Sequence, residues 1–289
     1  MDIRLMEYYL AVTREGNISA AAESLHVSQP GLSRQMKELE DELGVTLFER
    51  GSRKITLTEE GMILRKRAEE MVHLMQLTEK EITNVKNKIS GDIRIGAGES
   101  HAFHFLSRAA GELMQSYPDI RLHITSGDTN DLMEQLDNGL LDFALIFSDF
   151  DRSSYQTITL PLDDTFGVLM RKEHKLAVNE YLTVNDLYGE KLIVSRASEG
   201  LLFANADMTK LNIVATYNLV HNASILVEDK VGLALCFDHL VNTGSDSPLS
   251  FLPLRPSVSI KGTLIWKKYQ VLSPAVRLFI DSLNRQIEK

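Results

Sequence analysis

The sequence predicts an α/β protein with an N-terminal all-α domain, a long linker helix and a two-lobed α/β domain. Three observations support this fold class. Short helical patterns separated by turn residues occupy the first part of the chain, an apolar repeat without proline follows over residues 58–89, and beyond residue 90 strand patterns alternate with helix patterns. Alternation of this kind is typical of parallel strands joined by crossover helices.

The composition excludes several classes of protein. The 289 residues include 31 Lys and Arg against 40 Asp and Glu, and the net charge of -9 excludes a generally basic, histone-like protein. The single cysteine, Cys236, excludes an internal disulfide and any site that needs paired thiols. No apolar run reaches the roughly 20 residues of a membrane-spanning helix, and charged residues such as Arg4 and Glu7 interrupt the stretch where a signal peptide would lie. We therefore expect a cytoplasmic protein.

Three short helices are predicted in the first 44 residues. The apolar face of the first helix ends at Gly16 and Asn17, and the segment SAAAESL then resumes the helical pattern with small residues that permit close packing. Ser28 is a favourable N-cap for the third helix, whose first turn tolerates Pro30, and Gly44 suits the position just beyond its end. The apolar stripe of this third helix consists of Leu32, Met36, Leu39 and Leu43.

A hairpin and a long helix follow. Apolar residues on both sides of Gly51 and Ser52 predict a small β-hairpin over residues 45–57. From Thr58 the apolar positions alternate spacings of four and three, as in a heptad repeat: Leu64, Ala68, Met71, Met75, Thr78, Ile82, Val85 and Ile89. A stripe this narrow on a long helix favours pairing with another helix, and the alternative is a helix that folds back onto its own domain. The domains are accordingly expected at residues 1–58, 59–90 and 91–289.

Residues 91–289 predict two α/β lobes. Lobe one takes in about residues 91–161, with expected strands at 93–95, 120–124 and 143–147 and helices between them. Lobe two takes in about residues 162–265, with expected strands at 166–170, 192–194, 213–217 and 231–237. A strand near 264–266 and an amphipathic helix through Phe279 are expected to return the chain to lobe one, which would then include residues 266–289.

The first domain has the pattern of a winged helix-turn-helix. A recognition helix fits the major groove of DNA if its outward face carries hydrogen-bonding side chains near its start and longer cations beyond them. Gln29, Ser33, Arg34 and Lys37 all lie off the apolar stripe. Arg34 is suited to two hydrogen bonds with a guanine and Gln29 to two with an adenine, whereas Lys37 is expected to bind the DNA backbone.

Basic residues beside the hairpin turn complete this hypothesis. Arg50, Arg53 and Lys54 are placed where a wing follows the minor groove or its phosphates. The alternative is that these cations only solvate the surface, because acidic residues leave the segment without local positive charge: Glu38, Glu40, Asp41, Glu42 and Glu49. DNA binding is favoured because the basic residues share one helix face and one turn, while the acidic cluster lies at the far end of the helix.

The run from Tyr9 to Gly61 resembles the N-terminal domain of LysR-type transcriptional regulators, in the phrases AAAESLHVSQPGLSRQMKELEDELGVTLFER and RKITLTEEG. The resemblance implies that Ser33, Arg34 and Lys37 approach DNA from the recognition helix. It also implies that the helix from residue 58 is a dimerisation linker, and that residues 91–289 form an effector domain of the periplasmic-binding-protein type.

The resemblance is less complete in the wing. It implies that Arg50 and Arg53 approach DNA, but Lys54 stands where the family often has glycine and Thr56 where a basic residue is common. The resemblance therefore supports the helix contacts more fully than the wing contacts.

Polar residues at strand ends predict an effector site. In two-lobed α/β domains ligands bind at the carboxyl ends of strands, where helix N-termini present free N–H groups. The candidate residues are Ser100, Thr129 and Phe147 in lobe one and Ser195, Arg196 and Asn222 in lobe two. N-capping is the alternative for Ser100, Thr129 and Asn222, and core packing for Phe147. The cations Arg196 and His221 are expected in the same crevice as Glu99 and Asp149, so the sequence is consistent with effectors of either charge.

No catalytic, cofactor or metal site is predicted. The sequence contains no GxSxG, P-loop or HExxH motif, and His101 and His104 lack partners at metal-ligand spacing. Cys236 is expected to be a buried core thiol, and a regulator that senses peroxide through a disulfide would need a second cysteine.

The resulting hypothesis is a dimeric or tetrameric LysR-type transcriptional regulator, not an enzyme, whose partners are a partly palindromic double-stranded DNA operator, a small-molecule effector and further copies of itself. The alternative is a cytoplasmic small-molecule-binding or metabolic α/β protein with an accessory helical domain.

Overall fold

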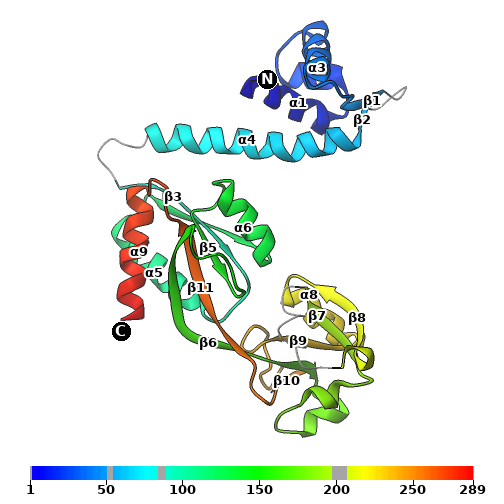
Figure 1. Cartoon of the computed structure of the whole chain (residues 1–289), viewed down its shortest axis with the longest axis vertical. Helices are drawn as coiled ribbons and strands as arrows, with labels where there is room; N and C mark the ends of the chain where they lie inside the picture. Colours follow the sequence, from blue (N-terminus) through cyan, green and yellow to red (C-terminus); the bar gives the residue numbers. More distant parts are fainter. Residues whose placement is uncertain (1, 51–54, 84–88, 197–206, 289) are drawn as a thin grey trace. The chain divides into compact units, whose positions relative to one another are not determined.

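The chain folds into two compact units, residues 1–88 and residues 89–289 (Figure 1). The computed structural model describes residues 2–50, 55–83, 89–196 and 207–288. Arg53 and Lys54 of the predicted wing lie outside these ranges. None of the helices within them is both long enough and apolar enough to cross a membrane.

Three short helices in the first unit confirm the prediction from turn residues. They are α1 (Ile3–Glu15), α2 (Ile18–Ser24) and α3 (Gln29–Leu43). The side chains of Asp2, Asn17 and Ser28 cap the three helices by accepting hydrogen bonds from backbone amides of the first turn. Gly16 and Gly44 end α1 and α3 with φ of 62° and 68°, a left-handed conformation that glycine adopts without strain.

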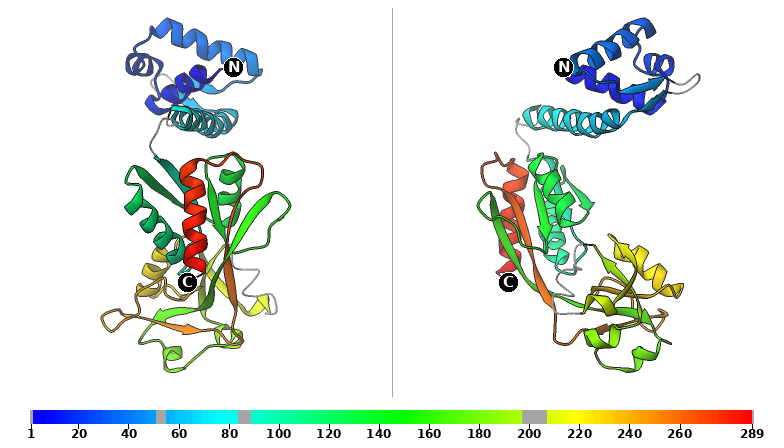
Figure 2. Two further views of the ribbon diagram at one scale, coloured as in Figure 1. Left: turned by 90° about the vertical axis from the view of Figure 1, so that its left-hand side faces the viewer. Right: turned by 45° about the vertical axis from the view of Figure 1, so that its right-hand side comes forward.

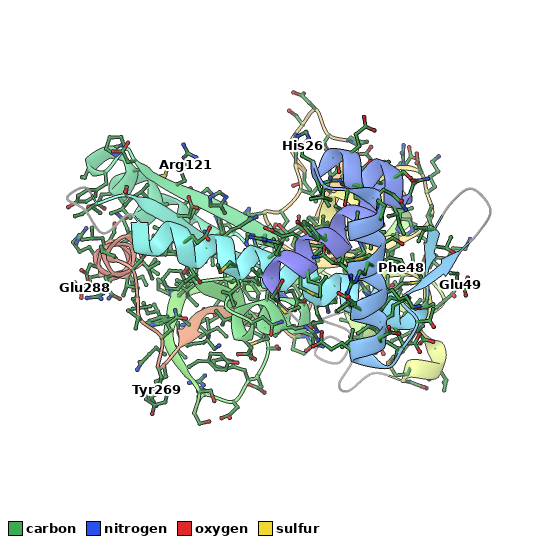
Figure 3. All side chains as sticks on the ribbon, turned by 90° about the horizontal axis from the view of Figure 1, so that it is seen from above. His26, Phe48, Glu49, Arg121, Tyr269 and Glu288 are labelled. Atoms are coloured by element: carbon green, nitrogen blue, oxygen red, sulfur yellow. The ribbon has the colours of Figure 1, made fainter. Side chains whose placement is uncertain are left out.

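A hairpin and the long helix α4 (Glu59–Thr83) complete the first unit. Strands β1 (Phe48–Arg50) and β2 (Ile55–Leu57) pair antiparallel, and along β1 Phe48 is buried whereas Glu49 is exposed (Figure 3). The buried Tyr9 hydroxyl on α1 donates a 2.6 Å hydrogen bond to the Gly61 carbonyl at the start of α4. The helix-turn-helix is thereby tied to the first turn of α4.

The apolar stripes of α3 and α4 differ in part from their predictions. Leu32, Met36 and Leu39 are buried as expected, but Leu43 is 40% exposed and does not belong to the buried stripe. On α4 the first half of the heptad pattern, which includes Ala68, packs against the core of its own unit, whereas Met75 is 42% exposed. The alternative of a helix that packs onto its own domain therefore applies to the first half of α4.

The second unit contains one sheet that extends through both lobes (Figure 2). Among the described residues the strand order is β4-β3-β5-β11-β6-β9-β7-β8, and β10 also pairs with β6. The strands are β3 (Gly91–Ala97), β4 (Ile120–Ser126), β5 (Phe143–Ile146), β6 (Tyr155–Arg171), β7 (Lys191–Ser195), β8 (Asn212–Tyr217), β9 (Leu233–Phe237), β10 (Leu249–Pro253) and β11 (Ser259–Lys267). Parallel pairs β3–β4, β3–β5, β7–β8 and β7–β9 confirm the predicted crossover connections.

Strands β6 and β11 pass from lobe one into lobe two. They pair antiparallel, with a register shift between Lys261 and Thr263, and beyond this pairing β6 continues against β9 and β10. The strand predicted at 166–170 is only the end of the 17-residue β6, which begins at Tyr155. The first residues of β6 were not predicted as a strand because their partner, β11, lies far downstream in the sequence.

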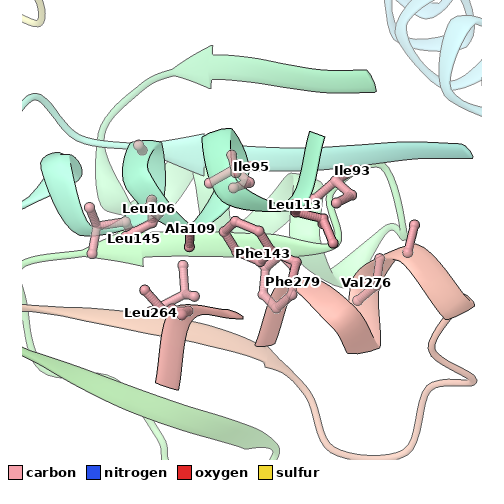
Figure 4. Packing of buried hydrophobic residues seen from close by; sticks show 14 of the residues in the cluster. Ile93, Ile95, Leu106, Ala109, Leu113, Phe143, Leu145, Leu264, Val276 and Phe279 are labelled. Atoms are coloured by element: carbon pink, nitrogen blue, oxygen red, sulfur yellow. The ribbon is translucent and has the colours of Figure 1, made fainter. Parts of the chain in front are cut away.

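Helices cover both faces of the sheet. They are α5 (Phe103–Ser116), α6 (Thr129–Asp137), α8 (Val220–Glu228) and α9 (Pro274–Ile287), together with the short 3-10 helices η1 (Lys175–Val178), η2 (Val184–Leu187) and η3 (Met208–Lys210). α9 returns to lobe one, as predicted, and shares a core with α5 and the strands: Ile93, Ile95, Leu106, Leu113, Phe143 and Phe279 (Figure 4). This packing brings strand ends and the N-termini of α5, α6 and α8 to the region between the lobes.

Candidate functional site

Helix α3, the predicted recognition helix, presents the predicted residues on its outward side. Gln29, Arg34 and Lys37 are exposed and Ser33 is half-buried. The Arg34 Nε atom lies 2.8 Å from Glu38 Oε1, and the Arg34 side chain is 81% exposed. Surface pairs of this kind contribute at most about 1 kcal/mol, so a DNA base or phosphate can replace Glu38 as the partner of Arg34 at low cost.

Glu40 has a role that the sequence did not reveal. Its Oε1 atom accepts hydrogen bonds from the backbone amides of Leu47 at 2.7 Å and Phe48 at 3.2 Å. The carboxylate therefore fixes the start of the hairpin against the recognition helix. Sequence reasoning counted Glu40 only among the acids that cancel the local positive charge, because its amide partners are seven and eight residues away and no local pattern marks them.

The wing is described only in its strands. Arg50 is the last residue of β1, and Thr56 lies in β2. The predicted contacts of Arg53 and Lys54 fall on residues outside the described ranges, so the wing contacts remain predictions.

A cavity of about 480 Å³ lies between the two lobes of the second unit. Strand ends and helix N-termini supply most of its lining. Lobe one contributes Gly98, Glu99, Gly127, Asp128, Thr129, Leu132, Leu145, Phe147, Ser148 and Asp149. Lobe two contributes Phe166, Ser195, Arg196, Tyr217, Asn218, Val220, Cys236, Phe237, Leu240 and Ile260. A volume of this size suits a small organic molecule.

Four of the six predicted effector contacts line this cavity, namely Thr129, Phe147, Ser195 and Arg196. Ser100 and Asn222 are not among the lining residues. Asn222 lies exposed in the first turn of α8.

Ser100 instead connects α5 to the long strand β6. Its hydroxyl donates a 2.6 Å hydrogen bond to Asp164 Oδ2 and accepts one of 2.9 Å from the Ala102 amide. Asp164, which is only 3% exposed, also accepts a hydrogen bond from the His101 amide. Burial raises the pKa of the Asp164 carboxyl, while the bonds from Ser100 and the backbone oppose the shift. Ser100 thus has a structural role beside the cavity, which no sequence motif indicated.

The raised pKa of Asp164 predicts a pH dependence of stability. The stabilising contribution of a carboxyl whose pKa is raised in the folded state is present below its ordinary value of 3.8 and is lost as the pH rises through the raised value. Compared with Asp164→Asn, the wild-type chain should therefore lose stability as the pH rises through this range. Urea unfolding followed by Trp266 fluorescence over a pH series measures the difference. Asp163→Asn, at a side chain that is 55% exposed, is the matched control, and a pH-independent difference would contradict the prediction.

Glu99 connects the lobes across the cavity. Its Oε2 atom accepts a 2.5 Å hydrogen bond from the Val220 amide at the first position of α8. In lobe two the Tyr217 hydroxyl donates to the Leu235 carbonyl at 2.7 Å, and burial raises the pKa of Tyr217. These bonds make the cavity wall a defined surface formed by both lobes.

Three histidine rings lie close together near the strand ends. The His101 ring centroid is 4.7 Å from that of His104 and 4.9 Å from that of His239. Within the described ranges no group of three His, Cys, Asp or Glu side chains is arranged to hold a metal ion.

Two family models match the chain. The model described as "LysR substrate binding domain" matches residues 86–288, and "Bacterial regulatory helix-turn-helix protein, lysR family" matches residues 3–62. The first match covers the second unit and its cavity, and the second covers α1 to the start of α4.

Curated relatives and a solved structure agree with these matches. A hydrogen peroxide-inducible genes activator of Pectobacterium carotovorum is 33% identical over 195 residues, which cover 67% of this chain and 64% of that protein. The DNA-binding transcriptional dual regulator OxyR of Escherichia coli K12 is also 33% identical, over 67% of this chain and 63% of its own length. The match thus spans just under two thirds of these relatives.

The crystal structure of CbnR, a LysR family transcriptional regulator, has a similar fold. Its TM-score is 0.75 at 18% identity, with 100% of both chains covered. At 18% identity this similarity shows a shared fold only. The family models, in contrast, match most of the sequence. The chain therefore belongs to the LysR family of bacterial regulatory helix-turn-helix proteins.

Proposed function

We propose that this protein is a sequence-specific transcriptional regulator that binds double-stranded DNA through α3 and its hairpin and binds a small-molecule effector in the cavity between the lobes. The observation that carries the DNA-binding part is the arrangement of α3, where Arg34 and Lys37 are exposed on the side opposite the buried Leu32 and Met36. Membership of the LysR family supports the same function.

The regulator acts as a homo-oligomer in the cytoplasm. The exposed Leu74 and Met75 in the second half of α4 support pairing with another chain. A homodimer binds a partly palindromic operator with half-sites in successive major grooves. The effector binds one arrangement of the assembly more tightly than the other and so shifts the population between them, without catalysis.

The proposed function does not include peroxide sensing through a disulfide, although relatives are named hydrogen peroxide-inducible genes activators. The sequence contains one cysteine, and a disulfide within one chain needs two. Cys236 is also buried, and burial raises its pKa to about 12, so little of the reactive thiolate is present near neutral pH.

Removing the Arg34 side chain is expected to weaken specific DNA binding. One lost base contact costs about 1–3 kcal/mol, or roughly a tenfold to hundredfold loss of operator affinity. Genome-wide mapping of wild-type and Arg34→Ala protein first identifies the operators, and gel-shift titrations then measure affinity. Arg65→Ala is the matched control, because Arg65 also pairs with a glutamate four residues later but lies on α4.

Three outcomes of these measurements distinguish the possible functions. Discrete palindromic sites that the Arg34→Ala protein loses and the Arg65→Ala protein keeps support the regulator. Unchanged operator affinity for Arg34→Ala would overturn the assignment of α3 as the recognition helix. Diffuse occupancy by well-expressed wild-type protein would favour a metabolic or ligand-binding role for the α/β unit.

A further inference from the structure

The chain's own carboxylates already occupy the helix N-termini that adjoin the cavity. Asp128 accepts a hydrogen bond from the Asp131 amide at the start of α6, and Glu99 accepts one from the Val220 amide at the start of α8. Beside the cavity, Asp164 accepts a hydrogen bond from the His101 amide, just before the start of α5. Helix N-termini are the usual binding sites for anionic ligand groups. An anion that enters this cavity therefore meets positions already filled by negative charge.

The arrangement at α8 is the clearest case. The N-cap of this helix is Leu219, whose side chain offers no hydrogen-bond acceptor and makes no capping bond. The missing acceptor comes instead from Glu99, which lies 121 residues earlier and on the other lobe. A carboxylate from a ligand would have to displace Glu99 to reach the Val220 amide.

The charges of the lining also favour a cation. The described lining residues include three carboxylates, those of Glu99, Asp128 and Asp149, and one guanidinium, that of Arg196. Because a cavity wall of low polarity strengthens electrostatic interactions, the surplus of carboxylates attracts a positive ligand and repels a negative one.

The remaining walls suit an organic body. Phe147, Phe166 and Phe237 line the cavity, with the Phe237 centroid 5.4 Å from that of Phe147 and 4.3 Å from that of Phe166. Aromatic faces bury apolar groups and attract cations. This observation is independent of the carboxylates and points to a ligand with both an apolar part and a positive charge.

We propose that the cavity selects an organic cation, a protonated amine on a small apolar or aromatic body, and that Glu99 sets this selectivity. Glu99 accepts the hydrogen bond of the Val220 amide, the first of α8, which an anion would otherwise use, and it places a carboxylate at the boundary of both lobes. A carboxylate accepts roughly four hydrogen bonds, so the bond from Val220 leaves capacity for an ammonium group. The inference rests on the proposed effector-binding function of the same cavity.

Three probes of similar shape and different charge test the inference. Titration calorimetry of the full chain would compare 2-phenylethylamine, 2-phenylethanol and phenylacetate. We expect the amine to bind at least about tenfold more tightly than phenylacetate, as a charge-assisted contact predicts. In Glu99→Gln the amide oxygen can still accept the Val220 hydrogen bond, but the charge is gone. The amine should then bind about tenfold more weakly, and phenylacetate more tightly.

Two further variants make the test decisive. Glu180→Gln makes the same chemical change at an exposed residue outside the cavity lining and should leave all three affinities unchanged. Asp149→Asn, at an exposed lining residue, should lower the amine affinity severalfold even if Glu99→Gln fails to fold. The inference is overturned if the amine does not bind at millimolar concentration, if phenylacetate binds more tightly, or if a folded Glu99→Gln chain keeps the wild-type preference. If Glu99→Gln does not fold, an unchanged preference in Asp149→Asn overturns it. These titrations contain no DNA, so their failure is distinct from a failure to bind operators.

Discussion

Alanine at position 167 is expected to destabilise the second unit by about 3 kcal/mol or more, the upper end of overpacking effects. Gly167 lies in β6, where it pairs with Pro253 of β10 on one side and Cys236 of β9 on the other. A Cβ atom at this position would overlap the Phe251 ring and the Leu252 backbone carbonyl. The carbonyl cannot rotate away as a flexible side chain would, so β6 and β10 would have to separate.

Gly111→Ala makes the same chemical change with the opposite expected sign. Gly111 lies in the exposed face of α5, and a Cβ atom there meets nothing within 4 Å. Alanine in a helix interior is more favourable than glycine by roughly 0.5–1 kcal/mol, so this variant should be stabilised. Urea unfolding of both variants can be followed through Trp266, the only tryptophan, which lies in β11 of the second unit. A Gly167→Ala chain as stable as the wild type would show that β10 is not held against β6 as described.

The sequence predicted those elements whose signals are local. Helix α3 was predicted because the N-cap Ser28, the C-terminal Gly44 and the apolar stripe between them all lie within seventeen residues. Strand β6 was only partly predicted because its first half is defined by pairing with β11, about a hundred residues later. Strand β10, which was not predicted, has the single described partner β6 and too short a pattern to stand out.

In the candidate site, too, the sequence predicted features with local signals and missed contacts between distant residues. Thr129, Phe147, Ser195 and Arg196 line the cavity because they end or follow strands, and strand ends can be located from sequence. The hydrogen bond of Ser100 to Asp164 spans 64 residues, and that of Glu99 to Val220 spans 121. Contacts at such separations depend on how the lobes pack, and a single sequence carries no pattern for them.

Cys236 is expected to react about a thousandfold more slowly with iodoacetamide in the folded chain than in the unfolded chain. The thiol is 3% exposed, and burial raises its pKa from 9.0 to about 12. Because the thiolate is the reactive form, a rise of about three pKa units leaves about a thousandth of the thiolate at a given pH below both values. Mass spectrometry after timed alkylation at pH 8, in buffer and in urea, measures the ratio. Equal rates would contradict the burial of this thiol.

The reactivity of Cys236 also reports on the strand pairing that the first prediction concerns. Gly167 and Cys236 are direct neighbours in the β6–β9 register, so a change that opens β6 exposes the thiol. Gly167→Ala should therefore accelerate alkylation of Cys236 in buffer. The thiol reacts in the open state, so the rate of alkylation follows the equilibrium population of that state. Gly111→Ala should leave alkylation as slow as in the wild type or slower. If Gly167→Ala lowers the urea midpoint without accelerating alkylation, the opening is confined to the β6–β10 side and does not extend to the β6–β9 pair.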